Sequence, residues 1–389
     1  MTAYRRGMRL RALAGPLLVS LAAGCTSSNA SSPGPLGGDA GDAGAPSGAR
    51  DVLLARMVAE RGLVGCTAAV RRGAFAWSGA AGVADLTTGA PLSPDTPLRI
   101  ASITKAMTAT VVMSLVDEGR VALDATVSTY LPDVRGADRY TVRQLLGHRT
   151  GLVPYQETEA FARQGGFGDP SKVWSPRALV ALVEDLPLAF EPGTNLAYSN
   201  TNFVLAGMIA EKQAGVPVEQ ALRERVYGKA GMKDAWLDGA EAVARPLARG
   251  YSVRFDARGN VLASPGPKTD TTTALNPSVA WTTGAVVSTA PDVARFFEAL
   301  LAGRLVSSAS TTAMTTSPAA PGVTPAYGLG LWRYGNASTA GWGHTGDTAG
   351  YRSFGAGTAA GETVAAVVCN DDADAEAPRA IAEALAAEP

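Results

Sequence analysis

Ser102 and Lys105 stand three residues apart in a segment that has the pattern of a helix. Helical spacing of three places a hydroxyl and an amine on one face, within reach of each other. A lysine amine normally titrates near 10.4, but burial in apolar surroundings lowers that pKa and allows the neutral amine to accept the serine proton. The pair therefore predicts a nucleophile and its base. Alone the match is weak, because the serine could equally cap the helix and the lysine could be solvated.

Two further short sequences carry groups that could act with this pair. Tyr198 and Asn200 lie in a turn before a predicted helix, where Asn200 could instead cap the helix and Tyr198 pack at its base. His344, Thr345 and Gly346 form a predicted strand end with a partly cationic ring, a hydroxyl and a glycine that would let a ligand backbone approach. The alternative is a plain strand end with a satisfied imidazole. His148, the chain's other histidine, is interpreted as bracing a loop.

The predicted strands cluster at both ends of the chain, with helices between them. Helices are expected at residues 49–61, 102–118, 141–146, 176–186, 201–214, 217–230, 292–301 and 375–386. Strands are expected at residues 64–70, 74–84, 327–333, 341–345, 351–355 and 363–368. Because strands gather at both ends of the chain, the α/β (α+β) class is predicted, with one antiparallel sheet built from both termini and flanked by helices. Residues 50–118 and 283–389 would form this domain, and residues 119–282 an inserted, mostly helical subdomain.

The order of the motifs along the chain indicates a family resemblance that no single motif indicates alone. Ser-x-x-Lys, then Tyr-x-Asn, then His-Thr-Gly resembles the penicillin-recognising enzymes, and most closely the class C β-lactamase-like group. Within it the chain is most similar to the secreted serine D-alanyl-D-alanine carboxypeptidases. That similarity also runs through residues 115–120, 129–132, 141–144, 198–203 and 327–331 and covers nearly all of residues 50–389. The implied fold is β-lactamase/transpeptidase-like.

The resemblance implies a role for each residue. Ser102 would be the nucleophile, Lys105 the acylation base and Tyr198 the phenol that passes the proton to the leaving group and later activates water. The backbone N–H groups of Ser102 and Asp347 would form the oxyanion hole. The substrate-binding residues would be Asn200, His344, Thr345, Gly346, Trp281 and Trp332. His344 replaces a common lysine, so this position should lose positive charge as pH rises through an imidazole pKa near 6.5 if unperturbed.

The motifs predict the type of reaction more closely than they predict the substrate. D-alanyl-D-alanine carboxypeptidase or β-lactamase-like activity is expected, with an esterase or amidase on small substrates and a slowly deacylating penicillin-binding sensor as alternatives. Trp332 and Asp347 stand where the carboxypeptidases carry an arginine and a threonine that hold the substrate carboxylate, so weak release of free D-alanine is predicted. Arg333 could take over only if the strand shifted.

The N-terminus has the pattern of an export signal rather than of a folded segment. A basic stretch is followed by the apolar residues 12–23 and by Cys25, which resembles the lipidated cysteine at the end of a lipobox, although Ala22 stands where leucine is usual. An ordinary signal peptide or a membrane anchor are the alternatives. Residues 1–25 would be the signal and the small, polar residues 26–49 a flexible tether. A lipid-anchored cell-envelope protein is therefore expected.

Composition excludes other classes of function. A hydrophobic content of 46% supports a large core, and a net charge of -1 does not suit nucleic-acid binding. Two histidines and three cysteines cannot easily assemble a metal site, so no metal or cofactor is expected. The protein is expected to be monomeric, with a small-molecule or peptidoglycan-peptide substrate. Cys66 and Cys369 fall in the first and last predicted strands, which are neighbours in the resembling superfamily; a disulfide and two buried thiols both remain open.

Overall fold

The computed structural model describes residues 48–318, 326–335 and 341–389. The export signal, Cys25 and nearly all of the tether therefore lie outside the described residues. What is described belongs to one compact unit, Gly44–Pro389. No helix within these ranges is both long and apolar enough to cross a membrane.

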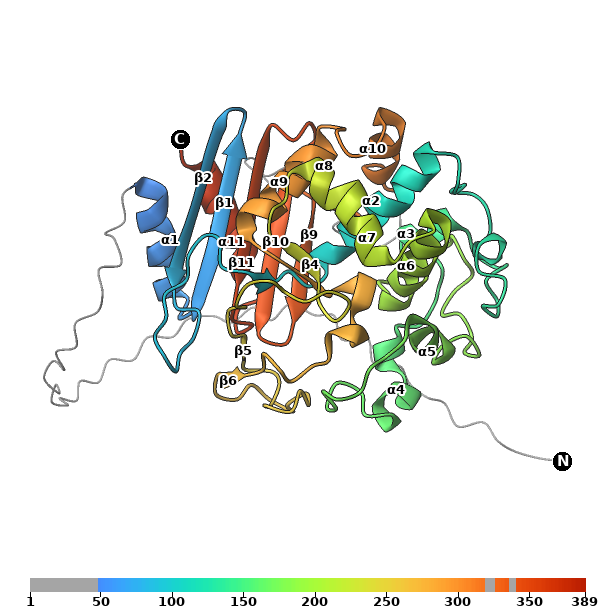
Figure 1. Ribbon diagram of the computed structural model, residues 1–389, viewed down its shortest axis with the longest axis horizontal. Coiled ribbons are helices and arrows are strands. Elements are labelled where there is room, and N and C mark those ends of the chain that lie inside the picture. The colour runs from blue at the N-terminus through green and yellow to red at the C-terminus, as the bar shows by residue number, and fades with distance from the viewer. Residues whose placement is uncertain (1–47, 319–325, 336–340) are drawn as a thin grey trace, which may run out of the picture. The chain divides into compact units, whose positions relative to one another are not determined.

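A six-stranded antiparallel sheet organises the unit (Figure 1). Its strands, in spatial order, are β2 Phe75–Gly82, β1 Gly65–Arg72, β11 Thr363–Cys369, β10 Tyr351–Thr358, β9 Gly341–Thr348 and β8 Trp332–Tyr334. The last strand of the chain thus pairs with the first, with Cys66 opposite Cys369. The predicted antiparallel sheet built from both termini is confirmed.

Helices cover both faces of this sheet. α1 (Ala49–Glu60) and α11 (Ala377–Ala387) pack on one face, and α9 (Ala290–Leu301) packs against β1, β10 and β11 on the other. Side chains alternate accordingly: Val367 belongs to the core under α1 and α11, and its neighbour Val368 to the larger core on the opposite face.

The second face also holds α2 (Ile103–Asp117), whose residues from Ile103 to Leu115 are all buried. α2 packs against α6 (Asn200–Ala214) and β9, two elements that carry other predicted site residues. Beyond them lie the remaining helices, α3 Val142–Leu146, α4 Glu159–Arg163, α5 Pro176–Ala181, α7 Val218–Leu222, α8 Gly228–Ala230 and α10 Ser308–Met314. Short strands β3 Leu98–Arg99, β7 Val286–Ser288 and β4 Ala235–Leu237 form a second sheet, and β5 Tyr251–Ser252 pairs with β6 Thr269–Asp270. The predicted division into a sheet domain and a helical subdomain remains a prediction.

Two predicted elements differ from the structure by five residues at one end. The strand expected from residue 327 begins only at Trp332, because the chain turns at Gly330, whose φ is +81°. A Cβ at this glycine would lie 2.5 Å from the Ala109 Cβ, so the turn packs directly on α2. The helix expected over residues 176–186 ends at Ala181.

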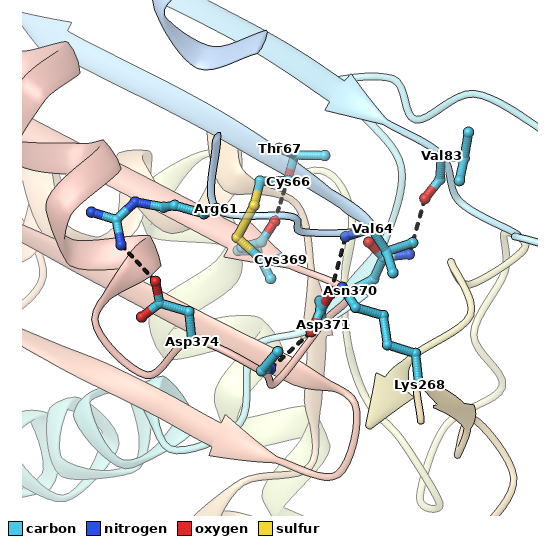
Figure 2. The surroundings of a disulfide bond; sticks show 12 residues. Arg61, Val64, Cys66, Thr67, Val83, Lys268, Cys369, Asn370, Asp371 and Asp374 are labelled. Atoms are coloured by element: carbon cyan, nitrogen blue, oxygen red, sulfur yellow. Dashed lines mark hydrogen bonds and ion pairs between the residues drawn. A yellow bond between two sulfur atoms is a disulfide. The ribbon is translucent and has the colours of Figure 1, made fainter. Parts of the chain in front are cut away.

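A disulfide joins Cys66 to Cys369, as the first of the two alternatives predicted (Figure 2). Both cysteines are fully buried. Polar contacts add to this connection. The Val64 N–H, just before β1, donates to the Asp371 carboxylate at 3.0 Å, and the Asn370 side chain, just after β11, donates to the Val83 carbonyl oxygen, just after β2, at 3.1 Å. The centre of the sheet is thereby tied covalently and by hydrogen bonds.

Candidate active site

The nucleophile stands at a sharp turn between β3 and α2. Ala101 adopts a φ of +48°, a conformation that is costly for a residue with a Cβ and that is typical of functional sites. Ser102 then occupies the N-cap position of α2, yet its side chain makes no capping hydrogen bond. The alternative in which this serine is a plain helix cap is therefore wrong, and its hydroxyl is available to the cavities beside it.

Lys105 is fully buried one helical turn further on. Its Nζ lies 3.0 Å from Ser102 Oγ and 2.7 Å from the Thr283 carbonyl oxygen. Burial holds the pKa of Lys105 well below its ordinary value. The solvated alternative is excluded, and burial favours the neutral amine, which within this distance of Ser102 Oγ can accept the serine proton.

Tyr198 completes the group at Ser102 from the turn before α6. Removal from water raises the pKa of Tyr198, and a smaller effect of its hydrogen bond with Ser102 lowers it. The phenol thus stays protonated while the lysine beside it is neutral, with Lys105 Nζ 4.9 Å from the ring centroid. Two groups with pKa values displaced in opposite directions divide the work of base and acid.

Asn200 is the first residue of α6, and Ser199 rather than Asn200 occupies the cap position. The Asn200 Oδ1 atom is buried without a hydrogen-bond partner in the described part of the chain. The alternative in which Asn200 caps the helix is therefore wrong. Its amide lines the space beside Ser102 and can hold a polar group of a substrate.

His344 differs from its prediction. The ring is 1% exposed, with Nδ1 2.5 Å from the Thr345 carbonyl oxygen and Nε2 3.3 Å from the Tyr327 hydroxyl. Burial, reinforced by the nearby Lys105, lowers the pKa of His344 to about 3, against the smaller effect of the hydrogen bond to Thr345. The imidazole is neutral at physiological pH, so the predicted loss of positive charge near pH 6.5 is wrong.

The other two members of this motif have different surroundings. Thr345 is exposed and lines the space beside Ser102, as predicted. A Cβ at Gly346 would lie 2.2 Å from the Ile100 carbonyl oxygen and 2.1 Å from Ser353 Oγ. The protein's own chain therefore fills the space that was predicted for a ligand backbone, and the glycine allows β9 to pack against the turn that carries the nucleophile.

His148 braces Tyr198, which agrees with its predicted structural role. The Ser199 N–H donates to His148 Nδ1 at 3.2 Å, and the ring centroid lies 4.3 Å from that of Tyr198. The histidine itself has a φ of +55° and is fully buried. It therefore fixes the turn that delivers the phenol.

Two cavities meet at Ser102. The first, of about 270 Å³, is lined largely by apolar side chains, including Tyr155, Phe167, Phe255, Leu275 and Val279. The second, of about 510 Å³, is lined by polar and aromatic side chains, including Tyr198, Trp332, Tyr334, Thr345, Glu376 and Arg379. Ser102, Asn200 and Asp347 line both.

The two predicted tryptophans are placed differently. Trp332 lines the second cavity and stacks on Tyr198, with centroids 6.2 Å apart and planes 12° from parallel. Trp281 lines neither cavity and packs against the large core instead. Arg333 is exposed and lines neither cavity, so it does not supply the missing guanidinium.

Three arginines at or beside the two cavities were missed by sequence reasoning. Arg379, on α11, places a guanidinium at the second cavity, where it packs over Tyr334 at 5.3 Å. Arg254 and Arg352 pair with Asp347 at 2.5 and 2.9 Å. The negative charge predicted at Asp347 is therefore neutralised by two guanidiniums. None of these arginines belongs to a local motif, so no signal in the sequence marked them.

Comparison with known proteins agrees with this geometry. The family model Beta-lactamase matches residues 51–388. The D-stereospecific amidohydrolase from Streptomyces sp. is 34% identical with a TM-score of 0.73, covering 86% of this chain and 97% of that one. The D-amino acid amidase from Ochrobactrum anthropi SV3, complexed with L-phenylalanine amide, is 30% identical with a TM-score of 0.72, covering 87% and 95%.

Among curated sequences, the esterase EstB from Burkholderia gladioli is 33% identical over 202 residues, which is 49% of this chain and 51% of that protein. The chain thus spans about half the length of this curated relative. Both the family match and the arrangement of Ser102, Lys105 and Tyr198 lead to one conclusion: this chain is a serine hydrolase of the beta-lactamase family.

Proposed function

We propose that this protein is an exported hydrolase that transfers a compact, apolar acyl group from a small ester or amide to Ser102 and then to water. The observation that supports it most is the buried Lys105 amine 3.0 Å from the Ser102 hydroxyl, where burial holds the pKa of Lys105 well below its ordinary value. An apolar cavity of limited volume adjoins that hydroxyl. An esterase and an amidohydrolase are among the relatives, which agrees with this reaction class.

The reaction follows from the positions of the groups. Lys105 takes the Ser102 proton while Oγ forms a bond to the substrate carbonyl carbon. The backbone N–H groups of Ser102 and Asp347 would stabilise the resulting oxyanion. Tyr198 then donates its proton to the leaving oxygen or nitrogen as that bond breaks, and Lys105 restores the phenol. In the second half Lys105 takes a proton from a water molecule as the water oxygen bonds to the acyl carbon. The bond between that carbon and Oγ then breaks, the proton passes to Ser102 Oγ, and the acid leaves.

A D-alanyl-D-alanine carboxypeptidase is the second candidate, because Arg379 provides a guanidinium at the cavity that Tyr198 lines. A carboxylate on the leaving group could pair with it, in place of the arginine that Trp332 replaces.

A sensor with a persistent acyl-enzyme is disfavoured by the intact pair of Lys105 and Tyr198, through which the deacylating water can lose its proton. Export and lipid anchoring through Cys25 belong to this proposal as well, since a cell-envelope location would meet such substrates.

Intact-protein mass spectrometry tests these alternatives directly. The protein would be incubated with a chromogenic ester, a penicillin and a D-Ala-D-Ala peptide, with Ser102→Ala as control. We expect transient acylation with turnover for the ester and no adduct in the variant. A stable adduct with penicillin and no turnover of the other two would support the sensor, and an adduct that survives Ser102→Ala would refute the proposal. A preference for a free over an amidated peptide terminus that is lost in Arg379→Met would favour the carboxypeptidase.

A further inference from the structure

The two cavities can be assigned to the two halves of a substrate. Tyr198, the proton donor to the leaving group, lines the second cavity and not the first. The leaving group must therefore depart on the side of the second cavity. The acyl group then extends into the first cavity, among Phe167, Phe255, Leu275 and Val279.

Charge at this acyl cavity comes from two groups of side chains. Arg99 lines the cavity and pairs with Asp238 at 3.1 Å, so this group is balanced. The second group is a cluster that contains Asp347. Asp347 is the only acidic side chain among the described residues that line the cavity. It pairs with Arg254 and Arg352, and Arg254 also pairs with the buried Asp372 at 3.2 Å. Two guanidiniums and two carboxylates sum to zero, so Asp347 presents no unbalanced negative charge to a substrate.

An acyl group with a free α-ammonium needs an unbalanced negative charge beside it. Burying a cation beside a paired carboxylate and a guanidinium is unfavourable, whereas a neutral acyl group incurs no such cost in an apolar cavity. Amino acid amides, the substrate class in the name of the Ochrobactrum relative, carry this ammonium. Plain carboxylic acyl groups and N-acylated amino acids do not.

We propose that Arg254 is a specificity-determining residue: by pairing with Asp347 it makes the acyl cavity select acyl groups that lack a free α-ammonium. Arg254 itself lines the cavity, and the neighbouring Phe255 contributes to the apolar wall, with its ring 6.4 Å from that of Phe167. Loss of Arg254 would leave the cluster with a net charge of minus one and an accessible Asp347. This inference rests on the proposed Ser102 chemistry and defines its acyl substrate.

Two chromogenic esters with one carbon skeleton test the inference: p-nitrophenyl 3-phenylpropanoate and D-phenylalanine p-nitrophenyl ester. Assays at about pH 6.5 keep the α-amine protonated, since its pKa is about 7.7. The readout is the ratio of kcat/KM for the neutral ester to that for the ammonium ester. We expect the wild-type protein to favour the neutral ester more than about tenfold. Arg254→Met should reduce the ratio by roughly fivefold to tenfold, the size of one partly exposed charge interaction.

Three further variants make the ratio specific to the ion pair. Arg254→Lys keeps the charge and should retain the wild-type ratio, and Arg258→Met, on the exposed part of the same segment, should leave it unchanged. Adding Asp347→Asn to Arg254→Met should reverse the gain. If Arg254→Met does not fold, Asp347→Asn alone is informative, because a net positive cluster should raise the ratio by a similar factor.

The outcomes separate this inference from the function beneath it. A wild-type preference for the ammonium ester, or equal ratios for Arg254→Met and Arg254→Lys, would overturn the role of Arg254 while leaving the Ser102 chemistry intact. Hydrolysis of both esters by Ser102→Ala at the wild-type rate would instead refute the proposed function.

Discussion

The middle of the main sheet and its β8–β9 edge are built for different purposes. At the β1–β11 pair the cysteines are fully buried and bonded to each other, and the Val64 N–H beside them donates to the Asp371 carboxylate. At the β8–β9 edge three unfavourable features surround Ser102. Lys105 is buried, the side-chain Oδ1 of Asn200 has no hydrogen-bond partner among the described residues, and Ala101 has a strained backbone. Each of these costs folding free energy. Stability is therefore concentrated in the centre of the sheet, and the catalytic edge depends on the stability of that centre.

Ser102→Ala should show the largest separation between activity and stability. Without the nucleophile no acyl-enzyme can form, so kcat/KM for a chromogenic ester should fall by more than about 10⁴-fold. The free energy of unfolding should change by less than about 1 kcal/mol, because the side chain makes no capping hydrogen bond. Steady-state kinetics and urea denaturation measure the two quantities. Undiminished labelling by an acylating inhibitor would contradict the assignment of the nucleophile.

Lys105→Met should reduce activity and raise stability together. The base is lost, and acylation should slow by about 10³-fold or more. A thioether chain of similar length fills the site without a buried amine, so the unfolding free energy should stay equal or rise by about 1 kcal/mol. Stopped-flow acylation and thermal melts would show this. A variant that is clearly less stable than wild type would mean that the lysine supports the fold as well as the chemistry.

The double variant Cys66→Ala, Cys369→Ala should lose stability and retain activity, the opposite of the two variants above. Removing a crosslink that spans 303 residues frees the unfolded chain and should lower the unfolding free energy by about 3 to 5 kcal/mol. The kcat/KM of the folded variant should remain within about twofold of wild type. Thiol titration of denatured, unreduced protein gives an independent check, since free thiols at both positions would exclude the bridge. A large loss of activity in the folded variant would show that the two regions are coupled.

Acid should weaken the catalytic edge through His344. Its pKa is about 3 in the folded protein and near 6.5 when unfolded, so below pH 6.5 the unfolded state binds more protons and stability falls. Between pH 6.5 and 5 the loss from this residue should be about 2 kcal/mol. Urea denaturation of wild type and His344→Gln at both pH values measures it, and the variant should lose correspondingly less. Equal losses in the two proteins would indicate that the imidazole is protonated when folded.

What the sequence predicted depended on whether the signal was local. Ser102 and Lys105 are one helical turn apart, and the alternating strands at both ends of the chain indicate the sheet. The neutral state of His344 could not be predicted, because it depends on burial by residues distant in sequence. For the same reason Arg254 escaped notice: its partners Asp347 and Asp372 lie 93 and 118 residues away. Gly346 was identified but for the wrong reason, since its neighbour is Ile100.

The pairing of β1 with β11 also constrains when this protein can fold. The strand that lies beside the first one is the last to be synthesised, and their registered residues are separated by about the whole length of the domain. Contacts of such high sequence separation form late, because the closing of a long loop must precede them. Until residues 363–369 have been synthesised, β1 lacks its partner on this side, and the six-stranded sheet is incomplete.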